Sequence, residues 1–263
     1  MDSEQCPTDL WQFENGKYKT FIKFRNKWIP VAIWENSDTL FIDSERDISD
    51  KILYQFWADY DVLDFYSKFK KDKYLSKAIQ VLQGLRVMRN LDLNWGIFEA
   101  ILTQNSSIKR IRKMERNLRK FYGNGSTIAV QKLVSAKESE VEKKCKVGYR
   151  ARYLINVAKL LNNKKLNLEN LARMSTEEAR KALLKIKGIG PKVADIILLY
   201  TLGKPDTFPM DVWLKRALIR EYFGEKKIGN QKLRDFALNY FGKHAGIAHL
   251  YMFYYERKIL SQN

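Results

Sequence analysis

The sequence contains few of the residues that build metal centres and disulfide frameworks. Its 263 residues include two cysteines, Cys6 and Cys145, and two histidines, His244 and His249. Two cysteines are too few for a disulfide framework or for a four-cysteine zinc or iron–sulfur site. Two histidines exclude most histidine-rich metal centres. We therefore expect the protein to work without a metal or another cofactor.

Long apolar segments are missing as well. No run approaches the roughly 18 apolar residues that a membrane-spanning helix needs, and the longest candidate, residues 193–202, lies among charged neighbours. Residues 1–10 are polar and acidic, unlike a signal peptide. We expect a soluble protein of a reducing compartment, which would be the cytoplasm or nucleoid of a prokaryote, or the nucleus of a eukaryote.

Acidic residues are in deficit. Lys and Arg number 48 against 30 Asp and Glu, which gives a formal net charge of +18. A polyanion or an anionic membrane surface is therefore the expected partner, although charge alone does not choose between them. The chain is 45% hydrophobic and 13% aromatic, which excludes global disorder. Its length is typical of one large or two ordinary domains.

The order of apolar residues predicts a mainly α protein with a small N-terminal antiparallel β-sheet (α+β). Residues 18–24, 28–34 and 39–42 are rich in β-branched and aromatic residues and predict strands. Pro30 indicates an edge strand or a bulge. From Ile48 onward the apolar spacing becomes helical. We expect a small N-terminal β-rich domain with the first helices over residues 1–70, and a helical domain over residues 71–263.

Eight segments of the second part have helical spacing. They are residues 94–102, 107–121, 149–161, 176–185, 191–201, 211–222, 231–241 and 245–260. Ser175 and Glu178 have the spacing of a capping box. The charge-dense segment 137–146 is interpreted as a solvated helix face or a loop.

The sharpest local signal is the run LKIKGIGPKVAD over residues 184–195. Gly188 and Gly190 suit a tight turn between two helices, and Pro191 suits the first position of the second helix. The turn amides and the following helix N-terminus then face outward, where a phosphate can bind. The pattern predicts a helix-hairpin-helix at about residues 176–201. With the neighbouring lysines and the net charge, it favours duplex DNA over an ordinary helical hairpin.

Two side chains near the hairpin can carry chemistry. Lys192 lies in the first turn of the second helix, where the helix dipole and partial burial both favour the neutral amine, a nucleophile that can form a Schiff base. Asp211 opens the next helix after a Phe-Pro-Met turn. It can stabilise positive charge on a sugar during glycosidic bond cleavage. Taken separately, Lys192 can be a phosphate contact and Asp211 a helix N-cap; their order after the hairpin favours catalysis.

At these motifs the chain resembles the 8-oxoguanine DNA glycosylase/AP lyase family of helix-hairpin-helix glycosylases. The hairpin and the segment 204–212 (KPDTFPMDV) carry the resemblance, and further matches lie at residues 83–86 (QGLR), 105–110 (NSSIKR) and 148–153 (GYRARY). The resemblance covers about residues 75–260. It implies a monomeric enzyme that acts on damaged double-stranded DNA and flips the damaged base out of the helix.

The resemblance also implies roles for individual residues. Lys192 would attack the sugar C1′ and hold the sugar as a Schiff base, and Asp211 would stabilise the oxocarbenium-like state. The remaining implied roles belong to DNA contacts and to the base pocket. DNA contacts are implied for Asn105, Arg110, Tyr149, Arg150, Lys187, Gly188 and Gly190. His249 and Phe253 are implied to line the base pocket. The carbonyls of Leu184, Ile186 and Ile189 form a possible site for a monovalent ion.

Three departures from the family pattern concern the damaged base. The Gly-Gln-x-Phe-Arg-Trp segment that reads the oxidised base in typical members is not found in residues 10–30. His249 stands where the family usually has Gln, and Trp213 stands where a His follows the aspartate. The family therefore implies 8-oxoguanine opposite cytosine as the substrate without fixing it from these residues.

Three alternatives differ from this interpretation. A non-catalytic helix-hairpin-helix protein would use Lys192 as a phosphate contact. A glycosylase of the same fold could act on another damaged base; among these, a monofunctional alkylbase glycosylase typically lacks a lysine at this position, so Lys192 argues against that type. An iron–sulfur glycosylase of the endonuclease III type needs four cysteines, which the chain does not have.

Overall fold

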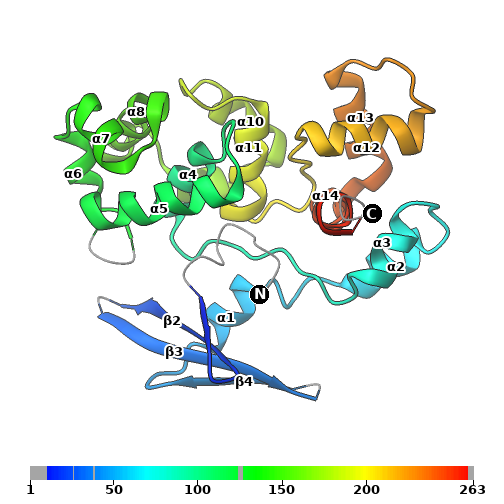
Figure 1. Cartoon of the computed structure of the whole chain (residues 1–263), viewed down its shortest axis with the longest axis horizontal. Helices are drawn as coiled ribbons and strands as arrows, with labels where there is room; N and C mark the ends of the chain where they lie inside the picture. Colours follow the sequence, from blue (N-terminus) through cyan, green and yellow to red (C-terminus); the bar gives the residue numbers. More distant parts are fainter. Residues whose placement is uncertain (1–10, 26, 38, 124–126, 260–263) are drawn as a thin grey trace.

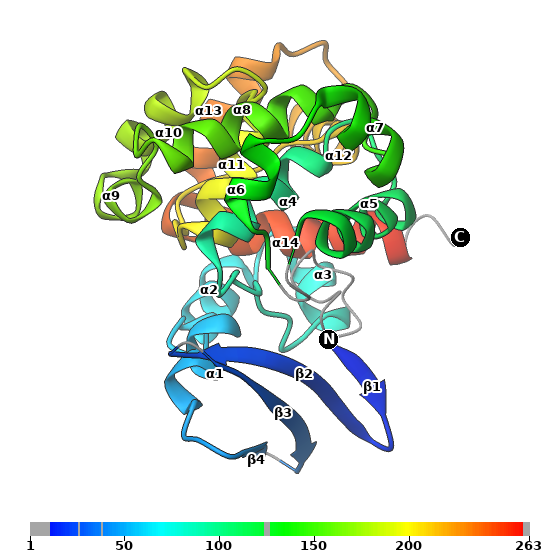
Figure 2. The same cartoon turned by 90° about the vertical axis from the view of Figure 1, so that its left-hand side faces the viewer.

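The computed structural model describes residues 11–25, 27–37, 39–123 and 127–259. A small β-sheet lies on one side of a larger helical body (Figure 1), and the short helix α1 (Ser49–Gln55) lies between the two (Figure 2). The predicted fold class, mainly α with a small antiparallel sheet, is confirmed. None of the helices in the described residues is long and apolar enough to cross a membrane.

The sheet is a four-stranded antiparallel meander in the order β1-β2-β3-β4. Its strands are β1 (Gln12–Glu14), β2 (Lys17–Phe24), β3 (Lys27–Asn36) and β4 (Thr39–Ser44). The three longer strands match the predicted ones, whereas β1 was not predicted because its three residues are too few to show an alternating pattern. Ile29, Val31 and Ile33 of β3 alternate toward the buried face, which packs on α1.

Pro30 lies in β3, which is an inner strand, so the expectation of an edge strand or bulge was wrong. The register explains why proline is tolerated there. Pro30 is paired with Phe21 of β2, but the pairing of β3 with β4 begins only at Val31 and Ser44. Pro30 therefore has a strand neighbour on one side only, and its missing N–H removes no bond from the β3–β4 ladder.

The helical body follows the predicted segments closely. Its first helices are α2 (Val62–Phe69), α3 (Leu75–Val81), α4 (Leu93–Leu102), α5 (Ile108–Tyr122), α6 (Val130–Val134) and α7 (Glu138–Cys145). The others are α8 (Ala151–Asn162), α9 (Leu168–Arg173), α10 (Thr176–Leu184), α11 (Pro191–Ile196) with its π-helical continuation η3 (Ile197–Thr201), α12 (Val212–Phe223), α13 (Asn230–Phe241) and α14 (Ala245–Tyr254) with η5 (Tyr255–Ile259). The short helices α6 and α9 were not predicted. The charge-dense segment forms α7 and buries Val141 and Cys145.

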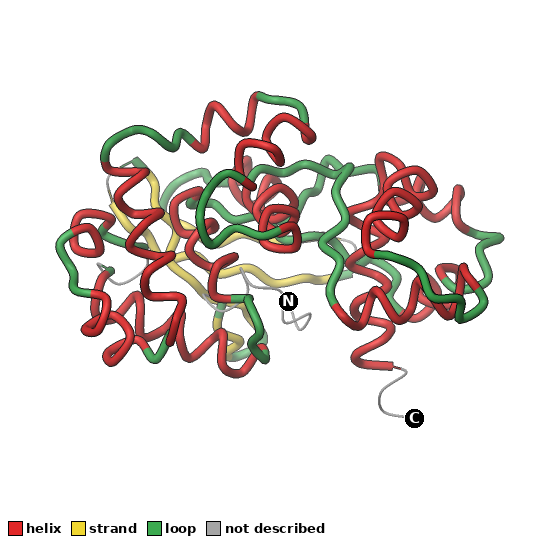
Figure 3. The backbone as a smooth tube through the Cα atoms, turned by 90° about the horizontal axis from the view of Figure 1, so that it is seen from above, coloured by secondary structure: helices red, strands yellow, loops and turns green. Residues whose placement is uncertain are grey.

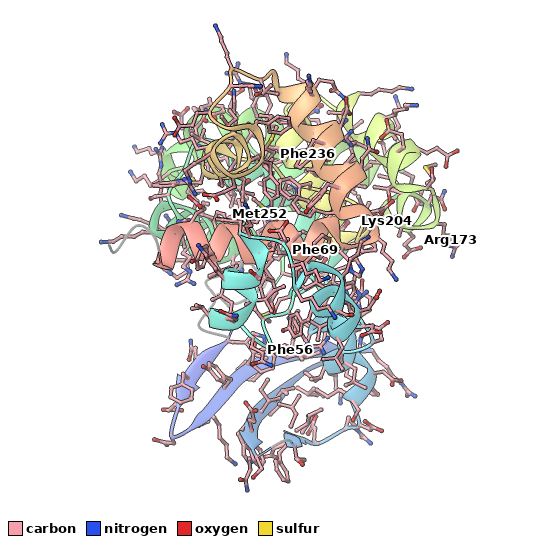
Figure 4. All side chains as sticks on the ribbon, turned by 90° about the vertical axis from the view of Figure 1, so that its right-hand side faces the viewer. Phe56, Phe69, Arg173, Lys204, Phe236 and Met252 are labelled. Atoms are coloured by element: carbon pink, nitrogen blue, oxygen red, sulfur yellow. The ribbon has the colours of Figure 1, made fainter. Side chains whose placement is uncertain are left out.

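Two hydrophobic cores divide the helices into two groups that stand side by side when seen from above (Figure 3). One core is built by α4 to α11. The other joins α2 and α3 to α12, α13 and α14, and includes Phe69 and Met252 (Figure 4). The helix that carries Lys192 lies between the groups, because Val193 and Leu198 belong to the first core and Leu199 to the second. The predicted domain boundary at residue 70 stays a prediction.

Candidate active site

The hairpin forms where the sequence predicts it. The capping box at the start of α10 is present: the Glu178 amide donates to Ser175 Oγ, and the Ser175 amide donates to the Glu178 carboxylate at 3.1 Å. Six residues, 185–190, separate α10 from Pro191, which occupies the first turn of α11. The chain therefore turns back within a short hairpin, and the N-terminus of α11 lies at its tip.

The two hairpin glycines serve different purposes. Gly188 has a φ of +98°, a conformation that L side chains rarely adopt, and its α-carbon packs on the ring of Tyr153. Gly190 has an ordinary φ of −88° and caps α11, and a Cβ atom built on it meets no atom within 4 Å. Gly190 is exposed. The open space beside it is where a phosphate can approach the amides of the helix N-terminus.

Lys192 is half-buried in the first turn of α11. Its ammonium group lies near the ring of His249 on α14, which is fully enclosed. Burial and, to a smaller extent, the positive charge of Lys192 lower the pKa of His249 to about 3, against a hydrogen bond to the Pro209 backbone that acts in the opposite direction. His249 is therefore neutral at physiological pH, and it places a polar, uncharged ring beside the candidate nucleophile.

Asp211 is the N-cap of α12. Its Oδ1 accepts the Leu214 amide at 2.9 Å, which is the structural role that the sequence left open. Within the described residues this is the only hydrogen bond of the carboxylate, so Oδ2 is available to another group. The cap thus fixes the orientation of the carboxylate without using both of its oxygens. The side chain is half-buried.

Aromatic rings surround His249. The ring of Phe208 meets it edge-on at a centroid distance of 5.7 Å, and the ring of Phe253 lies nearly parallel to it at 6.1 Å. Tyr200 Oη lies 3.4 Å from Nε2, whereas Nδ1 has no hydrogen-bond partner within the described residues. The structure therefore brings together the two residues that the sequence assigned to the base pocket. Tyr200 and Phe208 were not predicted, because nothing in their local pattern separates them from core residues.

The loop between α4 and α5 lies beside the hairpin. Gln104 Nε2 donates to the carbonyl oxygen of Gly188 at 3.0 Å. The next residue, Asn105, is exposed and has a φ of +41°, and its Nδ2 donates to Tyr149 Oη at 3.4 Å. Tyr149 is 38% exposed. Asn105 and Tyr149 thus form one exposed, hydrogen-bonded pair, and their contact with a duplex stays a prediction.

Arg150 does not point outward with them. It is 1% exposed, and its guanidinium donates to the carbonyls of Val147 and Gln104 and to Ser106 Oγ. Burial lowers the pKa of Arg150. In this structure the Arg150 guanidinium therefore supports the loop that carries Asn105, whereas the resemblance implied that Arg150 contacts DNA. Arg110, by contrast, is exposed.

Lys204, the first residue of the motif segment 204–212, forms hydrogen bonds within the protein. Its Nζ donates to the carbonyls of Ala172 and Met174 at 2.7 and 2.6 Å, beside Arg173 at the end of α9 (Figure 4). The unsatisfied carbonyls of a helix C-terminus attract a cation. This lysine therefore joins the segment before Asp211 to α9.

The remaining predicted site is the possible ion at the hairpin carbonyls. Ile186 O already accepts the amide of Ile189 at 3.0 Å, and this ion stays a prediction. The described residues contain no group of three or more His, Cys, Asp or Glu side chains that could hold a metal.

The buried ion pair between Arg180 of α10 and Asp195 of α11 was missed by the sequence analysis. Arg180 Nε donates to Asp195 Oδ1 at 2.8 Å. Asp195 lies one helical turn after Lys192, so the pair ties the two helices together directly beneath the candidate nucleophile. Asp195 lies in the apolar run of residues 193–202, but nothing in the local sequence identifies Arg180 as its partner.

A family model describing the HhH-GPD superfamily base excision DNA repair protein matches residues 98–241, more than half of the chain. The chain belongs to this superfamily. The matched region contains the hairpin, Lys192 and Asp211. The fold and family that the motifs indicated are therefore confirmed.

Individual relatives of this HhH-GPD protein cover nearly its whole length. A probable N-glycosylase/DNA lyase of Methanothermobacter thermautotrophicus is 27% identical over 97% of this chain and 91% of its own. The solved structure of MBOgg1 in complex with a low-affinity DNA ligand is 32% identical, with a TM-score of 0.86, over 98% of this chain and 90% of that one. A Clostridium acetobutylicum 8-oxoguanine glycosylase/lyase was solved with DNA containing cytosine opposite 8-oxoguanine. It is 28% identical, with a TM-score of 0.83, over 96% of this chain and 91% of that one.

Proposed function

We propose that this protein is a bifunctional DNA glycosylase/AP lyase that removes an oxidised purine, 8-oxoguanine opposite cytosine, from double-stranded DNA, and that it acts as a monomer. The observation that carries the proposal is the position of Lys192 in the first turn of α11, with the neutral ring of His249 beside it and Asp211 at the start of α12. The solved relative bound to the same lesion supports the substrate.

The chemistry follows from what these groups can do. A neutral Lys192 amine attacks C1′ of the flipped nucleotide, and the electrons of the glycosidic bond leave with the base, which takes up a proton. The C1′ centre passes through an oxocarbenium-like state, which the free oxygen of Asp211 stabilises. The sugar ring then opens to a protonated Schiff base. Loss of a C2′ proton expels the 3′ phosphate and nicks the strand.

The aromatic surroundings of His249 support a planar ligand. Phe253 is half-buried and presents a ring face, which can stack on an extruded base for about 1–3 kcal/mol. A neutral imidazole offers one donor and one acceptor. Nδ1 of His249 is buried and has no hydrogen-bond partner within the described residues, so an extruded base that reaches it would supply one.

Borohydride trapping tests the lyase step. The wild-type protein, incubated with a lesion duplex and borohydride, should give a covalent protein–DNA complex. Lys192→Gln should abolish trapping and retain DNA binding, because the exposed hairpin contacts remain. A wild-type protein that binds the duplex but never traps would refute the lyase. Running the assay with a panel of damaged bases, each opposite all four partners, identifies the substrate; trapping with every lesion except 8-oxoguanine would contradict that part of the proposal.

A further inference from the structure

Helix α5 is unusually basic for a surface helix. Over Ile108–Tyr122 it carries seven cations and one carboxylate, Glu115, which is buried. Four exposed cations follow one another at intervals of four, three and four residues, which places them on one face of a helix. They are Lys109, Lys113, Arg116 and Lys120, and we call them the α5 stripe.

A groove runs beside this stripe, between α5 and α7. It has a volume of about 520 Å³ and is lined by Arg110, Lys113, Met114, Glu142, Lys146 and Gly148. Three of the six lining residues are cationic and one is acidic. Within the described part of the chain, neither Lys113 nor Lys146 forms an ion pair with a carboxylate. The groove therefore carries uncompensated positive charge.

The groove continues the surface of the proposed DNA site. At the hairpin, a hollow of about 460 Å³ is lined by Gln104, Tyr153 and residues 184–190. Gln104 of this hollow precedes Asn105, and Gly148 of the groove precedes Tyr149. Asn105 and Tyr149 are hydrogen-bonded to each other. The hollow, the Asn105–Tyr149 pair and the groove thus form one track, with Lys185 and Lys187 at one end and the α5 stripe at the other.

We propose that the groove and the α5 stripe bind the phosphate backbone of the duplex that flanks the lesion, on the side away from the hairpin. The inference rests on the proposed function, because the hairpin and the Asn105–Tyr149 pair fix where the damaged nucleotide lies. From Lys109 to Lys120 the stripe extends about 16 Å. That length matches about five base pairs of one DNA arm. Cations that neutralise phosphates release counterions and give salt-dependent, sequence-independent affinity.

Equilibrium binding to duplexes with unequal arms tests the proposal. The lesion is placed so that either the 5′ or the 3′ arm is shortened to about three base pairs while the other stays longer than about ten, on the scale set by the stripe. For the wild-type protein, shortening the arm on the side of the α5 stripe should weaken binding about three- to tenfold more than shortening the arm on the side of the hairpin. Equal sensitivity to both arms, or to neither, would overturn the proposal.

The variant Lys113→Gln/Lys146→Gln identifies the surface. On the long-arm duplex its affinity should fall about three- to tenfold, and the slope of log K against log salt should decrease by about 1.8, or 0.9 per lost phosphate contact. On the short-arm duplex it should bind like the wild type. The control Lys71→Gln/Lys73→Gln removes two exposed lysines beyond α2 and should behave like the wild type throughout. A groove variant indistinguishable from this control would overturn the proposal.

Borohydride trapping at saturating DNA separates this inference from the proposed chemistry. The groove variant should trap as completely as the wild type, because Lys192 and Asp211 are unchanged. If the wild type never traps but still shows the one-armed length dependence and the loss in the variant, the lyase proposal fails and the surface stands. If the wild type traps but its binding does not depend on arm length, the lyase proposal stands and the proposed surface fails.

Discussion

The α-carbon of Gly188 lies against the ring of Tyr153, so closely that a methyl group at this position would overlap the ring. The contact joins the hairpin to α8, the helix that follows Tyr149 and Arg150. It therefore couples the two parts of the proposed DNA surface, and it requires a residue without a side chain at a φ of +98°.

Gly188→Ala should destabilise the protein, and Gly190→Ala should not. The first substitution forces a Cβ into Tyr153 at an unfavourable φ, which costs about 1–3 kcal/mol. The second places a Cβ in open space at an ordinary φ. Chemical denaturation measures the difference. Gly190→Ala should nevertheless weaken DNA binding, because the new methyl group stands where the phosphate approaches. Full affinity in this variant would mean that the hairpin tip does not meet the backbone.

Asp211 has a structural and a proposed catalytic role, which two substitutions can separate. Asn is as good an N-cap as Asp, so Asp211→Asn should leave the free energy of unfolding nearly unchanged and slow base release strongly, because the negative charge is gone. Asp211→Ala loses the bond to Leu214 and should also cost about 1 kcal/mol of stability. Single-turnover excision and denaturation are measured in parallel. Equal losses of binding and of excision in Asp211→Asn would make the residue structural only.

Removing one partner of the Arg180–Asp195 ion pair should destabilise the protein more than removing both. Both side chains are buried, and burial raises the pKa of Asp195. Arg180→Met leaves the carboxylate without its main partner and should cost about 3–5 kcal/mol. The double variant Arg180→Met/Asp195→Leu removes both buried charges and should be more stable than the single one. A double-mutant cycle by chemical denaturation checks this order; additive losses would contradict it.

Local signals predicted the parts of the fold that depend on neighbours in sequence. The capping box at Ser175 and Glu178 and the proline at the start of α11 act within a few residues, and both are where the sequence places them. Pro30 was misjudged because its tolerance depends on where β4 ends, which is a matter of register between strands. The sequence contains no local mark of that register.

The site shows the same limit. Lys192 and Asp211 lie in or beside motifs whose order in the chain could be recognised, and the resemblance implied the roles of His249 and Phe253. The orientation of Arg150 could not, because its burial depends on backbone carbonyls of residues about 45 positions earlier, at Gln104 and Asn105. Lys204 likewise bonds α9 through Ala172 and Met174. A basic residue in a motif thus has a predictable charge, whereas its partner is set by tertiary packing.

His249 should make the protein less stable in mild acid. In the unfolded chain a histidine has a pKa near 6.5, whereas burial lowers the pKa of His249 to about 3 in the fold. Between these values the unfolded chain binds a proton that the folded protein does not. Stability is therefore lost as the pH falls, by up to about 1.4 kcal/mol per unit, or about 2 kcal/mol at pH 5.

His249→Gln should remove this part of the pH dependence, because glutamine does not titrate. Burial also lowers the pKa of His244, so the variant should keep a smaller loss of stability in acid. Denaturation of both proteins at several pH values between about 7 and 4.5 gives the difference between their free energies of unfolding. The contributions of His244 and of the carboxylates are the same in both proteins and cancel in this difference. The two stability curves should converge as the pH falls if the variant is the less stable protein at neutral pH. Parallel curves would mean that His249 takes up a proton in the folded protein, and that the Lys192 pocket is open to water.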